Sequence, residues 1–250
     1  MIINLDNAIF YKNEDYTIFE IKNFLPLDIY KKLYSTFPGQ EFFKEEYTSK
    51  DKQSLSHENQ NFNDFVNQNP IWKEFLNSIN SQDFIDSAFK KSLIPNFRSR
   101  GLKSLKIWKL NKEKKSLLNI FTRKVKVSFH FSRIYDERRI APHTDASTKF
   151  LSFIYYFKDD DWHESEGGNT IFWKTIKNKE KWNNWSNKHM SDDTMNSFCL
   201  DNLKWKESKF EANKLVGFIK SSRSWHSVEK IKPKNGHVRK VLNFFIRRAD

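Results

Sequence analysis

The spacing of apolar residues changes along the chain, from steps of three and four in the first half to strict alternation in the second. In the first half this pattern predicts a short strand over 16–22, a helix over 26–37 that Pro38 and Gly39 end, and a helix over 72–79. Ser81 is placed to cap one more helix. The polar stretch 44–61 has little to bury and is expected to be a loop.

From Lys124 onward the period is two, because Val125, Val127 and Phe129 fall on one face and lysine, serine and histidine side chains fall on the other. Further strands are expected over 149–157, 169–173, 214–220, 225–231 and 238–247. Successive short strands without intervening helices favour an antiparallel sandwich or barrel.

The expected organisation is α+β, as one domain over 1–250. Residues 1–120 form a mixed, largely helical support, and 121–250 form the β core. The polar, tryptophan-containing segment 174–213 is interpreted as an insertion that acts as a mobile, substrate-proximal lid or binding loop.

Composition supports a folded chain and narrows its chemistry. Of the 250 residues 38% are hydrophobic and 16% aromatic, enough for a sizeable core. The sequence has no apolar run of the ~18–20 residues that cross a bilayer, and its start lacks a basic segment followed by an apolar block. A cytoplasmic protein with no membrane partner is therefore expected. The single Cys199 excludes an internal disulfide and a thiolate cluster, so a metal would have to be held by histidine and carboxylate.

The net charge of +13 is carried mostly by lysine, because only ten of the 44 cationic residues are arginines. Lysine acts as a point charge and lacks the planar fork that arginine offers to a phosphate. The lysines are spread over the whole chain, which favours a solvated basic surface over a dedicated polyanion site. Charge alone indicates no function.

Candidate chemistry begins at Pro142-His143-Thr144-Asp145. His143 and Asp145 are two residues apart at a strand end and point to the same face, where they could supply two ligands of a 2-His-1-carboxylate iron site. His226, in the predicted strand 225–231, is the candidate third ligand. An isolated H-x-D triplet is also compatible with an ordinary surface turn.

Two stretches resemble the iron(II)- and 2-oxoglutarate-dependent dioxygenases, most closely the prolyl-4-hydroxylase-like branch. The first, 133–173, is similar to the family's run of a tyrosine-bearing strand, the H-x-D motif, a strand of the type YYL-N-x-D-W, here YYFKDDDW, and an acidic loop closed by Gly-Gly. The second, 213–246, is similar to the strand of the distal histidine, a turn and the strand with the co-substrate arginine. The resemblance implies a double-stranded β-helix of the jelly-roll or cupin type, supported by N-terminal helices.

By this resemblance His143, Asp145 and His226 are the metal ligands and the catalytic residues, and Arg239 binds the distal carboxylate of 2-oxoglutarate. The family usually separates its distal histidine and this basic residue by about nine or ten positions, whereas 13 separate them here; the extra turn 232–236 accounts for the excess. The implied cofactors are Fe(II), 2-oxoglutarate as co-substrate and O2, with ascorbate as an optional reductant.

Three further side chains bear on the co-substrate. Tyr135 and Tyr156 occupy positions where the family often has a hydroxyl near 2-oxoglutarate, although core aromatic residues would look the same. In the last strand Arg239 shares a face with polar Asn243, whereas Lys240 can reach solvent from the other face. Arg239 rather than Lys240 is therefore expected to face the interior.

The implied activity is hydroxylation of an unactivated C–H bond, with release of succinate and CO2. The expected substrate is a prolyl or other side chain of a peptide, or a small molecule. Two alternatives stay open: a nucleic-acid-demethylating oxygenase, with which the basic net charge is compatible, and a non-catalytic β-barrel that binds a polyanion.

Among the remaining features, Trp182, Trp185 and Trp205 are expected to be buried rather than to stack on a ligand, and His130 is expected to be a solvated or cross-strand residue.

Overall fold

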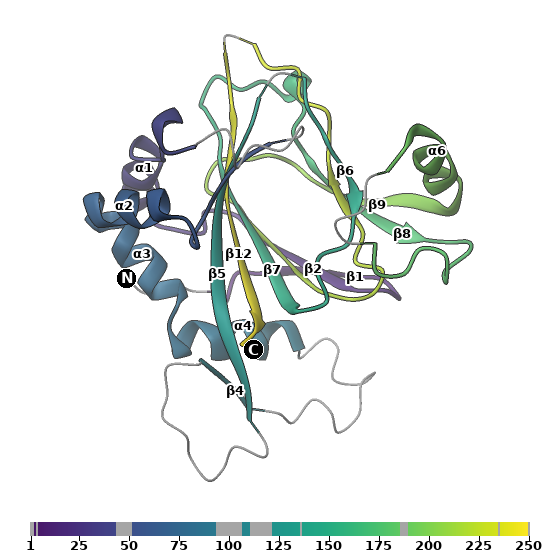
Figure 1. Ribbon diagram of the computed structural model, residues 1–250, viewed down its shortest axis with the longest axis horizontal. Helices are drawn as coiled ribbons and strands as arrows, with labels where there is room; N and C mark the ends of the chain where they lie inside the picture. Colours follow the sequence, from purple (N-terminus) through teal and green to yellow (C-terminus); the bar gives the residue numbers. More distant parts are fainter. Residues whose placement is uncertain are drawn as a thin grey trace.

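The computed structural model of the chain describes residues 3, 5–43, 52–93, 107–110, 122–135, 137–185, 190–234 and 236–249. Two antiparallel sheets face each other, with helices against the outer side of the larger one (Figure 1). The helices are α1 (Leu27–Ser35), α2 (Gln60–Gln68), α3 (Pro70–Ile79), α4 (Gln82–Leu93) and α6 (Asp192–Asp201), with short 3-10 turns at Gln40–Phe42 and Glu164–Glu166.

The large sheet has the strand order β1-β2-β10-β7-β12-β5-β3, and β4 pairs with β5 in parallel. Its strands are β1 (Ile9–Lys12), β2 (Thr17–Ile21), β3 (Gln53–Ser56), β4 (Ile107–Leu110), β5 (Thr122–Ile134), β7 (Lys149–Phe157), β10 (Leu215–Ile219) and β12 (Arg239–Arg248). Because β12 lies between β5 and β7, strands from both halves of the C-terminal region interleave, as in a double-stranded β-helix.

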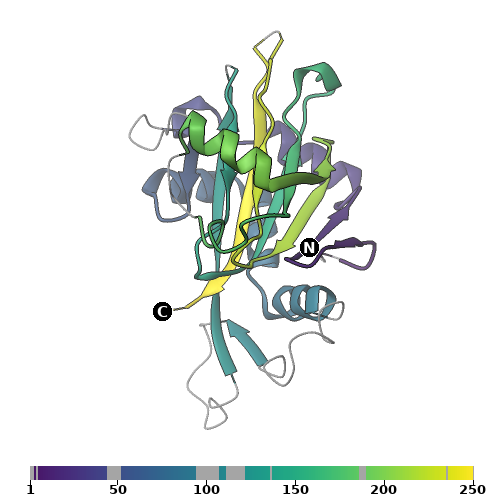
Figure 2. The ribbon, with the colours of Figure 1, turned by 90° about the vertical axis from the view of Figure 1, so that its right-hand side faces the viewer.

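The small sheet has the order β6-β11-β8-β9, formed by β6 (Ile140–His143), β11 (His226–Val228), β8 (Thr170–Thr175) and β9 (Asn202–Ser208). Helix α6 lies on this side of the molecule, in front of the sheets in Figure 2.

Two apolar layers hold these parts together. The helices pack on the even-numbered residues of β12, such as Leu242 and Phe244, and on Phe153 and Tyr155 of β7. Between the two sheets, Ile154, Tyr156 and Val241 of the large sheet meet aromatic and aliphatic residues of the small one. Both faces of β12 are thus covered, which explains its nearly continuous apolar sequence.

The antiparallel β core and its supporting helices confirm the expected α+β fold class, and the strands expected over 149–157 and 238–247 match β7 and β12 closely. The polar stretch 44–61 differs from expectation in the part that the structure describes, since β3 lies within it and α2 begins at Gln60. Strand β3 is anchored by one fully buried apolar residue, Leu55, too weak a signal for a periodic pattern.

The segment 174–213, expected to be a lid or binding loop, contains the helix α6 and the strand β9. As an edge strand, β9 exposes charged side chains along much of its length, so the spacing of its hydrophobic residues does not predict a strand. Trp182 in the same segment is fully buried beside Trp225 and Phe198, as expected, whereas Trp185 and Trp205 are partly buried. Among the described residues, no helix combines the length and apolar character needed to span a bilayer.

Candidate functional site

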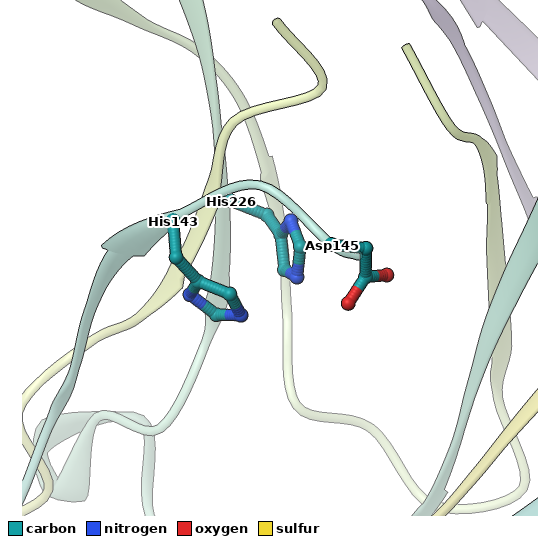
Figure 3. A group of neighbouring side chains, drawn as sticks. All are labelled: His143, Asp145 and His226. Carbon is teal, nitrogen blue, oxygen red and sulfur yellow. The ribbon is translucent and has the colours of Figure 1, made fainter. Parts of the chain in front are cut away.

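Three residues from the small-sheet side converge on one point between the sheets (Figure 3). His143 ends β6, Asp145 follows it by two residues, and His226 begins β11 directly opposite His143 in the strand register. One ligand atom from each side chain lies within 4.8 Å of the other two. The structure therefore brings together all three residues singled out in the sequence as metal ligands.

Backbone carbonyls set which nitrogen each imidazole presents. His143 Nδ1 lies 2.9 Å from the carbonyl oxygen of Ala141, and His226 Nδ1 lies 3.1 Å from that of Ser224. A carbonyl can only accept, so in both rings Nδ1 must carry the hydrogen and donate it. The lone pair then resides on Nε2, the nitrogen left available to a metal ion.

Burial keeps both imidazoles neutral. It lowers the pKa of His226 to about 3 and also lowers the pKa of His143 below its ordinary value. Burial by itself would raise the pKa of Asp145, but the charged and hydrogen-bonded Lys149 outweighs burial and lowers it, so the carboxyl stays ionised. Two neutral nitrogens and one carboxylate oxygen are the donor set of a mononuclear iron site.

The Asp145 carboxylate is oriented by two neighbours from β7. The Ser152 hydroxyl donates to Oδ2, and Lys149 Nζ donates to Oδ1 over 2.6 Å. Because both partners lie on the same strand, the carboxylate is held in place before any ion binds. Neither Lys149 nor Ser152 was singled out in the sequence, since each becomes a neighbour of Asp145 only when β7 is in place.

Arg239 lines the same cavity as the triad, which has a volume of about 100 Å³. It is 1% exposed; its Nε donates to the Gly168 carbonyl over 2.6 Å and its Nη2 donates to Thr170 Oγ1 over 3.2 Å. Burial lowers the pKa of Arg239 to about 10, well above neutral pH, so the side chain stays charged. Within the described residues, no carboxylate pairs with this cation.

The alternation of β12 places Arg239 in this cavity. Arg239, Val241, Asn243 and Phe245 all line it, whereas Lys240 points the other way and pairs with Asp159 over 2.8 Å. This is the strand register expected from the sequence.

A buried carboxylate shapes the turn beside Arg239. Glu166, fully buried, accepts hydrogen bonds from the backbone of His163 and Lys234 and from His237 Nδ1, over 2.8 to 2.9 Å. These bonds join the acidic loop to the connection between β11 and β12, which contains the extra turn noted in the sequence. Gly168, two residues later, has φ +87° and presents its carbonyl to Arg239.

The two candidate tyrosines have different surroundings. Tyr156 is fully buried beside Arg239, with its ring centroid 5.3 Å from the guanidinium carbon, and its hydroxyl donates to Thr170 Oγ1. The structure does not bring Tyr135 to the cavity; its ring contacts Arg138 instead. The reason is parity, because the even-numbered residues of β5, such as Ser132, face the cavity, and Tyr135 continues the odd-numbered face.

A second hollow continues from the triad and is lined in part by His130. His130 pairs across the sheet with β12, and the centroid of its imidazole ring lies 5.5 Å from that of the Phe245 ring. Burial and the nearby Lys52 and Lys149 lower the pKa of His130 to about 3. His130 is thus a neutral lining residue, and it is not among the clustered metal-ligating residues of the described chain.

Comparisons with known proteins agree with this geometry. Residues 129–247 match the model of the 2OG-Fe(II) oxygenase superfamily. A prolyl 4-hydroxylase from Phytophthora capsici is similar in structure, with a TM-score of 0.52 and 10% sequence identity, covering 93% of this chain and 59% of that one. A Pseudomonas putida prolyl-4-hydroxylase aligns over 94% of both chains with a TM-score of 0.47 and 12% identity. A comparison with curated protein sequences finds no significant match.

The structural similarity, at these identities, concerns the fold. The family match adds to this, because the matched range contains His143, Asp145, His226 and Arg239. Residues 129–247 thus match the 2OG-Fe(II) oxygenase superfamily, and this match indicates a dioxygenase that uses Fe(II), 2-oxoglutarate and O2.

Proposed function

We propose that this enzyme hydroxylates an unactivated C–H bond of its substrate while 2-oxoglutarate is converted to succinate and CO2. The observation that carries the proposal is the coexistence, in one cavity, of a three-ligand metal site and a buried arginine that has no carboxylate partner in the described structure.

In this proposal His143, Asp145 and His226 hold the iron. The donor set suits the ion, because two neutral imidazoles and a carboxylate on one side leave the opposite positions open. When bound, iron supplies the activation of O2 that no side chain can provide. The protein contributes the preset tautomers of both histidines and the fixed carboxylate of Asp145.

Arg239 binds the distal carboxylate of 2-oxoglutarate. A guanidinium can hold a carboxylate through two parallel hydrogen bonds, and burial strengthens such a pair because water cannot screen it. Its bonds to Gly168 and Thr170 fix the direction in which its remaining donors point. Tyr156 supports this arrangement by holding the Thr170 hydroxyl, so it positions Arg239 rather than contacting the co-substrate through its own donor.

In this proposal the helices and both sheets belong to a single domain. The apolar faces of the helices are buried against the large sheet, and strands from both parts of the chain complete the barrel. The segment 182–185 lies next to the metal site, since Thr144 N donates to the Trp185 carbonyl over 3.0 Å.

The test is incubation of the purified protein with Fe(II), 2-oxoglutarate and O2, first alone and then with a panel of peptides and small molecules. Succinate formation that depends on iron, together with a product heavier by one oxygen atom, is expected. His226→Ala should abolish succinate formation, and Lys240→Ala, on the outer face of β12, should retain it. Succinate production that survives His226→Ala would refute the assignment.

A further inference from the structure

A cationic groove adjoins the metal site on the side away from Arg239. We call it the outer groove and define it by Lys52, Ser128, His130, Lys149, Asn243 and Arg247. It shares His143 and Asp145 with the cavity that contains Arg239, so the triad lies where the two spaces meet.

Strand β12 runs past both spaces. Its odd-numbered face begins with Arg239 and ends with Arg247, with Asn243 between them in both linings. Eight residues of extended chain separate the two arginines by roughly 27 Å. One anion held by Arg239 cannot also reach Arg247, so the two cations serve different groups.

The strand register gathers positive charge at this end. Arg247 is directly opposite Lys126 on β5 and Lys149 on β7, so three cationic residues occupy neighbouring positions on adjacent strands. Like charges placed opposite one another on a sheet are destabilising. Among the described residues, the carboxylates that form ion pairs with this row are Asp145, a metal ligand in the proposed function, and Glu58, which is 69% exposed and bonds Arg247 Nη2 over 2.9 Å.

The outer groove also contains unused hydrogen-bond donors. Ser128 Oγ, on a residue 1% exposed, and Arg247 Nε are both buried and have no hydrogen-bond partner in the structure. Ser128 lies opposite Phe245 on β12, two residues before Arg247 along that strand. A buried hydroxyl or guanidinium donor without a partner costs free energy that a bound acceptor would recover.

We infer that the outer groove binds an oxyanion of the primary substrate, a carboxylate or a phosphate, between Arg247 and Lys149 with the Ser128 hydroxyl as an additional donor. The inference rests on the proposed function and specifies its substrate class. An anion anchored here extends past the triad toward the cavity, which brings a carbon of the same molecule beside the metal.

Binding can be measured without turnover. The protein is loaded with Mn(II) in place of Fe(II) and saturated with 2-oxoglutarate, which occupies Arg239. Inorganic phosphate and acetate are then titrated separately, and the paramagnetic effect of Mn(II) on 31P and carboxylate 13C relaxation reports each bound anion. At least one of the two anions is expected to show saturable, Mn(II)-dependent relaxation; which of them does so identifies the substrate group.

Arg247→Gln should weaken that binding by about tenfold, the loss of one charge-assisted contact. Arg248→Gln is the matched control, because it removes the same charge from the next residue, whose exposed side chain lies on the other face of β12, and it should leave binding unchanged. Ser128→Ala, which removes one neutral donor, should weaken binding by a smaller factor.

Equal weakening by Arg247→Gln and Arg248→Gln would show that only the overall charge matters and would overturn the inference. Relaxation unaffected by both Arg247→Gln and Ser128→Ala would mean that the anion binds the metal alone, which overturns it as well. If Mn(II) and 2-oxoglutarate bind but neither anion does, this inference fails and the proposed function stands. If Mn(II) or 2-oxoglutarate does not bind, the proposed function itself fails.

Discussion

Replacing Arg239 by methionine tests the co-substrate site and the electrostatics of the cavity together. Methionine keeps a long apolar side chain in a position that is 1% exposed but removes the charge. In the absence of 2-oxoglutarate the native guanidinium is buried without a carboxylate partner in the described structure, an unfavourable arrangement. We therefore expect the free protein to lose at most about 1.5 kcal/mol of stability, mainly from the unpaired Gly168 carbonyl.

The effect on binding should be much larger. Truncating one partner of a buried, hydrogen-bonded charge pair costs about 2–5 kcal/mol, which corresponds to roughly thirtyfold to several thousandfold weaker binding of 2-oxoglutarate. A ligand at a hundred times its dissociation constant stabilises the native state by about 2.7 kcal/mol. For a chain of this size that is a rise of about 5–10 °C in melting temperature.

The assay is thermal unfolding of the Mn(II)-loaded protein with and without 2-oxoglutarate, paired with calorimetric titration. The native protein and Lys240→Met, whose cation pairs with Asp159 on the other face, should both show the rise, and Arg239→Met should not. A full rise in Arg239→Met together with its loss in Lys240→Met would show that the assigned face of β12 is wrong.

Three further expectations follow from neighbouring contacts. His226→Ala should weaken Mn(II) binding by more than about a hundredfold, measured by metal titration, because it removes a ligand rather than a supporting contact; unchanged affinity would exclude the triad as the metal site. Gly168→Ala should cost about 1–3 kcal/mol in denaturant unfolding, because φ is +87° and the new Cβ would lie 3.2 Å from Arg239 Cδ; an equally stable variant would contradict this geometry. The hydrogen bond to Glu166 raises the pKa of His237 above 6.5, so its contribution to stability is complete below pH 6.5 and is lost as pH rises through the raised value. The stability difference between native protein and His237→Gln should shrink over that interval, and a difference that grows with pH would reverse the sign of this reasoning.

The candidate metal site could be predicted from the sequence because two of its proposed ligands are local. His143 and Asp145 are two residues apart, so any extended backbone there points them in the same direction. His226 is distant in sequence but belongs to a strand that the alternating pattern reveals, and it falls opposite His143 in the register. Arg239 was placed by the same kind of argument, since strand parity needs only the local sequence.

Other parts of the fold and site could not be predicted from the sequence, for identifiable physical reasons. Strand β3 contains a single fully buried apolar residue, and β9 is an edge strand with charged side chains, so neither produces a clear alternation. Tyr135 was assigned to the co-substrate by resemblance, yet the alternation of β5 carries it away from the cavity. In that case strand parity was the better guide.

The outer groove shows why strand register matters more than composition for this chain. Its cations come from three places far apart in sequence: Lys52 just before β3, Lys149 at the start of β7 and Arg247 near the end of β12. In the sequence they are indistinguishable from the other basic residues of a chain with a net charge of +13. Only the pairing of β12 with β5 and β7 sets Arg247 between Lys126 and Lys149, near the candidate metal site. This pairing concentrates a diffuse basic composition into a local positive field, which is the basis for inferring an anionic substrate.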